Sequence, residues 1–158
     1  MKIAHIFNAQ SYLIAESYIR FIRDCFPVED HDIIVVGKIT GQSKYDFPAN
    51  LTHVVYFAGY DEEHRKIFNH LRKYDKILLH SLSVPVKAQA RFLANPSFMN
   101  KLYWVAWGND LYNWKNQSKT VKAFITNRVF FAFRKHMSAF VGIFPPDIDF
   151  YRKIFNAR

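Results

Sequence analysis

Short apolar runs alternate along the chain with longer segments whose apolar residues recur at helical spacing. The runs predict six strands, at residues 3–7, 33–36, 52–57, 76–79, 102–107 and 140–144. The periodic segments predict helices, at residues 10–26, 61–74, 83–95, 118–137 and 149–155. Strands and helices that alternate in this way are typical of βαβ units. We therefore expect an α/β fold, a Rossmann-like three-layer domain with a mostly parallel sheet whose strand order is left open.

Capping and turn residues set the expected ends of these elements. Asp61 is expected to cap the second helix, and Ser83 the third, with Pro85 in its first turn. Polar stretches that contain glycine or proline predict loops at residues 38–50 and 145–147.

Helical spacing also predicts which side chains face the core. In the first helix the inward row is expected to comprise Ile14, Tyr18, Ile22 and Cys25, with Phe21 alongside. In the second helix it is expected to comprise Ile67, Phe68 and Leu71.

The helix over residues 118–137 combines basic and apolar residues. One row is expected to pack on the sheet: Val121, Phe124 or Ile125, Val129, Ala132 or Phe133, and Met137. Phe130 and Phe131 fall outside this row, near Arg134 and Lys135. Aromatic and basic side chains together off the core face suit an anionic membrane surface, so these four are the predicted membrane-facing residues. A second domain or subunit that covers them is the alternative.

The candidate site with the most polar and aromatic residues follows the fifth predicted strand. There the apolar run breaks abruptly into Gly108-Asn109-Asp110, between Trp107 and Tyr112. Ligands of open α/β sheets bind at the carboxyl ends of strands. Asp110 suits a general base or a ligand of sugar hydroxyls, but it equally suits a turn that binds its own backbone. The two aromatic side chains would form flat apolar walls beside it.

A histidine follows the fourth predicted strand in the same manner. His80 precedes Ser81 and would lie at the same edge as Trp107 if both strands are parallel. A neutral imidazole there would accept a proton or donate to a phosphate oxygen, and a purely structural role is the alternative. His5 falls inside the first strand, where a core histidine is expected.

Several familiar chemistries lack their motifs. Residues 8–11, Asn-Ala-Gln-Ser, follow the first strand where a dinucleotide fold has its glycines, and there is no Walker A loop. No Gly-x-Ser-x-Gly surrounds Ser81 or Ser83. The seven histidines are scattered without metal-ligand spacing. No cofactor and no metal are therefore expected.

Composition narrows the class of partner. The 158 residues suit one domain, and half of them are apolar, so a substantial core is expected. The formal net charge of +9 favours anionic partners, among them nucleic acid, phospholipid headgroups and phosphorylated substrates. Cys25 is the single cysteine, which fits a reducing compartment. No apolar run is long enough for a transmembrane helix.

These motifs together resemble the fucosaminyltransferases of enterobacterial common antigen synthesis, which transfer 4-acetamido-4,6-dideoxygalactose. The family's Trp-Gly-x-Asp-Leu-Tyr pattern matches residues 107–112. Residues 34–38, 79–82 and 141–142 are similar in order and spacing, and the resemblance covers essentially the whole chain. The chain departs at Ser81, where the commonest family version has glycine.

The resemblance implies the N-terminal, acceptor-side domain of a GT-B glycosyltransferase, over residues 1–158. The donor would be a dTDP-linked sugar held by a further, nucleotide-sugar-binding domain after residue 158. The acceptor would be an undecaprenyl-diphosphate-linked saccharide, and the location the inner face of the bacterial plasma membrane. The isolated domain is expected to be inactive, and its bare partner-facing surface would allow self-association.

The resemblance and the strand-end positions together give the expected site. Asp110 and His80 would be catalytic. Substrate would be bound by Asn8, Ser81, Trp107, Gly108, Asn109 and Tyr112. The alternative function is a non-catalytic basic module for nucleic acid or a protein partner. Nucleic acid is the less expected of these, because most aromatic residues fall in predicted buried elements.

Overall fold

The chain folds as two compact units, Met1–Leu79 and His80–Arg158, and each is described by itself. The computed structural model describes residues 1–9, 12–37, 54–61, 63–112, 118–142 and 144–155. The predicted loop over residues 38–50 lies outside these ranges.

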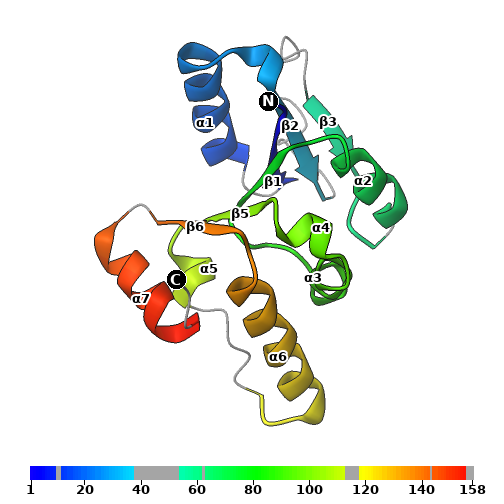
Figure 1. Cartoon of the computed structure of the whole chain (residues 1–158), viewed down its shortest axis with the longest axis vertical. Coiled ribbons are helices and arrows are strands. Elements are labelled where there is room, and N and C mark those ends of the chain that lie inside the picture. Colours follow the sequence, from blue (N-terminus) through cyan, green and yellow to red (C-terminus); the bar gives the residue numbers. More distant parts are fainter. Residues whose placement is uncertain (10–11, 38–53, 62, 113–117, 143, 156–158) are drawn as a thin grey trace. The chain divides into compact units, whose positions relative to one another are not determined.

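The first unit is built on parallel strands in the order β3-β2-β1-β4 (Figure 1). Their bounds are Ile3–Asn8 for β1, His31–Val36 for β2, Val54–Phe57 for β3 and Lys76–His80 for β4, whose last residue belongs to the second unit. The helices are α1 (Tyr12–Cys25), the short η2 (Val28–Asp30) and α2 (His64–Leu71). In Figure 1, α1 and α2 lie on opposite sides of these strands. Cover on both sides explains why most residues of these strands are apolar.

The buried face of α1 differs from the predicted row. Ala15, Ile19 and Ile22 are buried, whereas Cys25 is exposed and Phe21 is 50% exposed. The inward face is therefore rotated around the helix from the predicted one, and Ile22 is common to both. Ala15 has no exposed surface. Its small side chain lets the helix approach the strands closely, and this packing advantage is not visible in hydrophobic spacing alone.

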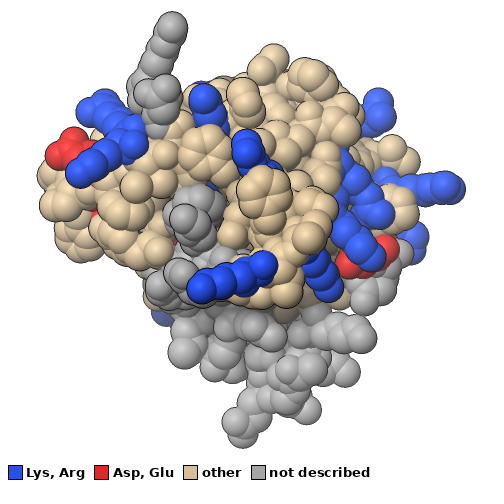
Figure 2. All heavy atoms as spheres, turned by 90° about the horizontal axis from the view of Figure 1, so that it is seen from below, with Lys and Arg blue, Asp and Glu red and all other residues tan. Residues whose placement is uncertain are grey.

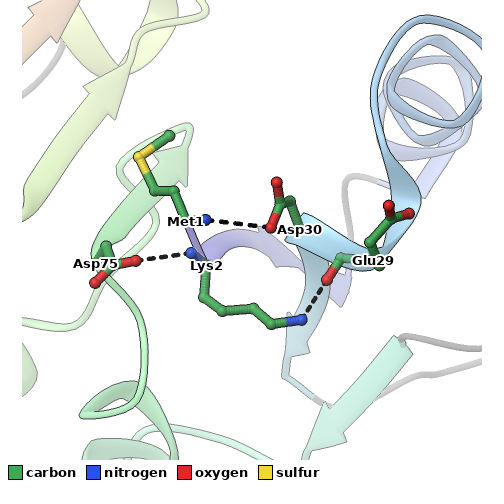
Figure 3. Close-up of polar contacts among 5 residues, drawn as sticks. All are labelled: Met1, Lys2, Glu29, Asp30 and Asp75. Atoms are coloured by element: carbon green, nitrogen blue, oxygen red, sulfur yellow. Dashed lines mark hydrogen bonds and ion pairs between the residues drawn. The ribbon is translucent and has the colours of Figure 1, made fainter.

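Charged groups join the amino-terminal ends of the strands in the first unit (Figure 3). The amino group of Met1 lies 3.3 Å from Oδ1 of Asp30. The backbone N–H of Lys2 donates to Oδ2 of Asp75 at 2.8 Å, and its ammonium group donates to the carbonyl of Glu29. The start of β1 is thus connected to the residues that precede both β2 and β4.

The second unit combines two parallel strands with five helices in its described part. The strands are β5 (Leu102–Val105) and β6 (Ala139–Val141), paired through Trp104 and Phe140. The helices are α3 (Val86–Leu93), α4 (Pro96–Met99), α5 (Asn109–Tyr112), α6 (Val121–Lys135) and α7 (Pro145–Phe155). All strand pairings described in either unit are parallel, so the predicted α/β, Rossmann-like fold class is confirmed.

Trp104 is the centre of the aromatic core of the second unit. It has no exposed surface, and its ring makes edge contacts with Phe140, Tyr151 and Phe155 at centroid distances of 5.1, 5.8 and 6.4 Å. Phe140 stacks on Tyr151 at 4.2 Å. This cluster joins β5 and β6 to α7, and edge-to-face pairs of this kind add to the stabilisation from burial.

Two predicted helix caps are wrong. Glu63, not Asp61, is the residue that precedes α2, and its Oε2 accepts from the backbone N–H of Ala58 at 2.6 Å. Pro85, not Ser83, precedes α3, without a side-chain cap. In both places the helix begins later than predicted.

The predicted loop at residues 145–147 is also wrong, because these residues form the first turn of α7. Proline is well tolerated in the first turn of a helix, since the N–H group that it lacks has no partner there.

The predicted core face of α6 is correct only near the carboxyl end of the helix. Phe133 and Met137 are buried as expected, but Val121, Phe124 and Ile125 are 77%, 61% and 57% exposed. Successive residues at four-residue spacing advance by about 40° around an α-helix, because a turn takes 3.6 residues. The predicted row therefore winds away from the core towards the beginning of the helix. The inward face uses Ala123 there, and α6 packs on α3.

Candidate functional site

The loops that follow His80 and Val105 meet in the second unit. Ser81 has a positive φ of 60°, and its backbone N–H donates to the carbonyl of Val105 at 3.0 Å. Gly108 has a φ of 87°. Left-handed backbone is uncommon for a residue with a side chain and recurs at functional sites. We call Ser81, Leu82, Trp107, Gly108 and Asp110 the tryptophan corner.

The carboxylate of Asp110 holds the tryptophan corner together. Its Oδ2 accepts from the backbone N–H of Leu82 at 2.8 Å and from Nε1 of Trp104 at 2.7 Å. Its Oδ1 accepts from the backbone N–H of Trp107 at 3.0 Å. A carboxylate has about four acceptor positions. Within the described part of the chain, Oδ1 therefore keeps one position for a further donor.

A buried cation lies behind this carboxylate. Arg134 is 3% exposed, and its guanidinium carbon lies 5.1 Å from the ring centroid of Trp104. It donates to the carbonyls of Phe130 at 3.2 Å and Asp110 at 3.4 Å. Burial lowers the pKa of Arg134 to about 10, against the opposing effects of Asp110 and Tyr151. Arg134 therefore remains charged at neutral pH.

Arg134 was predicted to face a membrane, and that prediction is wrong, because the side chain is inside the second unit. Phe130 is half-buried, with its ring centroid 5.5 Å from the guanidinium carbon of Arg134. Phe131 is also half-buried and packs against Phe155 at 5.6 Å. Of the four predicted membrane-facing residues, Lys135 is exposed. The helix turns Arg134 towards Trp104 and Phe131 towards α7, which the sequence pattern did not reveal.

His80 and Trp107 lie together as the strand-end argument predicted. Their ring centroids are 6.0 Å apart, with an angle of 52° between the planes. His80 has no exposed surface, however, whereas Trp107 is only partly buried. An imidazole closed off from solvent does not meet a substrate in this structure, so the geometry favours a structural role for His80 over the catalytic one.

Tyr112 connects α5 to the start of α7. Its side chain is 48% exposed, and its hydroxyl donates to Oδ1 of the buried Asp147 at 2.5 Å. The hydrogen bond to Asp147 raises the pKa of Tyr112. The Tyr112 ring lies 4.8 Å from that of Phe150. Asp147 and Arg134 are parts of this site that the sequence argument missed, because a carboxylate in a proline turn and an arginine on a helix both resemble ordinary surface residues.

Asn8 belongs to the first unit. It ends β1 beside Gly37, where a side chain built on the glycine would lie 3.8 Å from Oδ1 of Asn8. Gly37 has a φ of 129°. Asn109 begins α5, and its side chain lies outside the described part of the structure.

No group of three histidine, cysteine, aspartate or glutamate side chains is arranged to hold a metal ion among the residues that the structure describes. In the same ranges no helix has the length and apolar character needed to cross a bilayer.

Comparison with known proteins supports the fold. No protein-family model and no curated protein matches the chain. The chain is similar to the solved structure of a short-chain dehydrogenase/reductase (wide type) from Veillonella parvula DSM 2008 in complex with NADP. The TM-score is 0.52 at 13% identity, over 89% of this chain and 67% of that chain. At this identity the similarity establishes a Rossmann-like fold, and the NADP belongs to that protein.

Proposed function

We propose that the chain forms the acceptor-binding side of a glycosyltransferase of the fucosaminyltransferase type, as the N-terminal half of a GT-B architecture. One observation carries the proposal: Trp107, whose side chain is partly buried, donates its backbone N–H to Oδ1 of Asp110, and that oxygen can accept one more hydrogen bond. Aromatic faces match the apolar faces of sugar rings. A saccharide stacked on Trp107 would donate one hydroxyl hydrogen to Oδ1 of Asp110.

The proposed reaction joins a saccharide hydroxyl to an amino-deoxyhexose. The hydroxyl oxygen forms a bond to the anomeric carbon of the dTDP-sugar, the bond from that carbon to the diphosphate breaks, and dTDP leaves with the electron pair. The hydroxyl proton passes to the carboxylate of Asp110. In this proposal Asp110 orients the hydroxyl, and a further domain binds the donor. Within the second unit, Ser81, Gly108, Asn109 and Tyr112 remain proposed substrate contacts.

The test uses this chain and a soluble acceptor analogue, a saccharide linked through diphosphate to a short prenyl chain. Calorimetric titration should detect binding that Trp107→Ala weakens by about tenfold and Trp107→Phe weakens less, because stacking depends on an aromatic face. Phe21→Ala is the matched control, since it removes a half-exposed aromatic ring from α1. Equal binding by Trp107→Ala and the original chain would exclude the proposed sugar site.

The second candidate function is a basic module that binds nucleic acid or a protein partner. The net charge of +9 favours it. Nucleic-acid binding would fall steeply with salt, because each neutralised phosphate releases counterions. A gel-shift titration at two salt concentrations, with the acceptor analogue as competitor, separates the two functions.

A further inference from the structure

The first two turns of α6 present an apolar face to solvent. Val121, Phe124 and Ile125 are 77%, 61% and 57% exposed. They stand at positions i, i+3 and i+4, so they share one side of the helix. The opposite side carries the buried Ala123 and Phe133, of which Phe133 packs against Phe92 of α3 at 5.9 Å. We call Val121, Phe124 and Ile125 the α6 apolar face.

Basic side chains surround this face. Lys119, Lys122 and Arg128 are exposed, and the guanidinium carbon of Arg128 lies 5.1 Å from the ring centroid of Phe124. Residues 118–135 contain no acidic side chain. On the face drawn in Figure 2, most of the charged side chains are Lys and Arg.

We propose that the α6 apolar face docks onto the surface of an anionic lipid membrane. Exposed aromatic and aliphatic side chains bordered by cations match the boundary between acyl chains and anionic headgroups. The charge disfavours a second copy of this chain, because a symmetric contact would bring like charges together. The surface is not the predicted one, since Arg134 is buried and Phe130 and Phe131 are half-buried. The inference is independent of the proposed transferase function.

Vesicle flotation with the whole chain tests the proposal. The chain should float with vesicles of phosphatidylcholine and phosphatidylglycerol and remain below vesicles of phosphatidylcholine alone. Phe124→Ser with Ile125→Ser should weaken partitioning by about tenfold or more, because two apolar side chains no longer enter the lipid. Phe144→Ser is the matched control, since Phe144 is 63% exposed and precedes α7, and it should bind as the original chain does.

A second variant keeps the test independent of folding defects. Lys122→Glu with Arg128→Glu retains the apolar side chains and should also weaken binding to anionic vesicles about tenfold or more, since basic residues near such a surface are attracted to its anionic headgroups. The proposal is overturned if the original chain does not float with anionic vesicles, or if neither double variant changes its flotation. Equal weakening by Phe144→Ser would overturn it too. So would a dimer, detected by sedimentation velocity, that the serine variant abolishes.

Discussion

Nε1 of Trp104 donates to Oδ2 of Asp110 at 2.7 Å, so the most central side chain of the aromatic core is tied directly to the candidate site. The guanidinium group of Arg134 lies against the same indole. The packing of the aromatic core and the geometry of the tryptophan corner are therefore coupled. Substitutions at Trp104, Asp110 or Arg134 should affect both.

Asp110→Asn should destabilise the second unit. An amide offers one oxygen where the carboxylate offers two, so at least one of the donating groups on Leu82, Trp104 and Trp107 would face an NH₂ group. We expect a loss of about 2–4 kcal/mol in the free energy of unfolding, since hydrogen bonds to charged groups are worth about 1.5–3 kcal/mol each. Urea denaturation measures this. Asp149→Asn, an exposed carboxylate on α7, is the control, and equal stability of the two variants would contradict the expectation.

Arg134→Lys should also destabilise the protein, although the charge is kept. An ammonium group does not reproduce the planar contact with Trp104 and the two separate bonds to the carbonyls of Phe130 and Asp110. A loss of about 1–3 kcal/mol is expected. Lys135→Arg, the reverse exchange at the next and exposed position, should be neutral within about 0.5 kcal/mol. If Lys135→Arg shifted the urea midpoint and Arg134→Lys did not, the expectation that Arg134 is the buried cation would be contradicted.

The stability of the chain should fall as the pH is lowered from about 6.5. Nε2 of the buried His5 lies 2.8 Å from Nδ1 of His31, and burial, with the nearby His31, lowers the pKa of His5 to about 3. Between pH 3 and the ordinary histidine pKa of about 6.5, the unfolded chain therefore binds more protons than the folded one. The slope contributed by His5 is about 1.4 kcal/mol per pH unit in this window.

Replacement of His5 isolates that contribution. Urea denaturation between pH 4 and pH 7 gives the slope of the free energy of unfolding against pH. In His5→Gln this slope should be smaller by about 1.4 kcal/mol per pH unit, which corresponds to one proton. His64→Gln, at the start of α2, serves as the control. An unchanged slope in His5→Gln would show that His5 is not the titrating group.

Two glycines of the second unit should resist substitution for different reasons. At Gly108 a Cβ would meet no atom within 4 Å, but the φ of 87° is strained for alanine. Gly108→Ala should therefore lower the free energy of unfolding by about 1–2 kcal/mol, and Gly108→Asn should lower it less. At Gly142 a Cβ would lie 2.9 Å from the ring of Phe140, so Gly142→Ala should cost about 1–3 kcal/mol by overpacking. Thermal unfolding of the three variants checks the order, and equal stability of Gly108→Ala and Gly108→Asn would reject backbone strain at Gly108.

The sequence was informative where one physical effect dominates. Strands buried on both sides give continuous apolar runs, so five of the six predicted strands extend to within two residues of the observed bounds. The sixth, predicted at residues 140–144, is observed at Ala139–Val141. The meeting of His80 with Trp107 also followed from the strand ends. These features depend on local patterns that the neighbouring elements do not alter.

Prediction failed where tertiary packing decides between similar faces. Arg134 and Lys135 are adjacent basic residues on one helix, yet one is buried and the other exposed. Trp104 supplies the aromatic surface that makes burial of the guanidinium group favourable, and it lies seventeen or more residues outside the helix. The burial of His80 is a similar case, because the pattern at the end of a strand does not reveal which elements cover the ring.

The network of donors around Asp110 has a thermodynamic consequence for any ligand of the tryptophan corner. Because Leu82, Trp104 and Trp107 are already immobilised through their hydrogen bonds to this carboxylate, association there requires little additional ordering of the backbone. Amide hydrogen exchange at Leu82 and Trp107 should accordingly be slow before a saccharide is added and nearly the same afterwards.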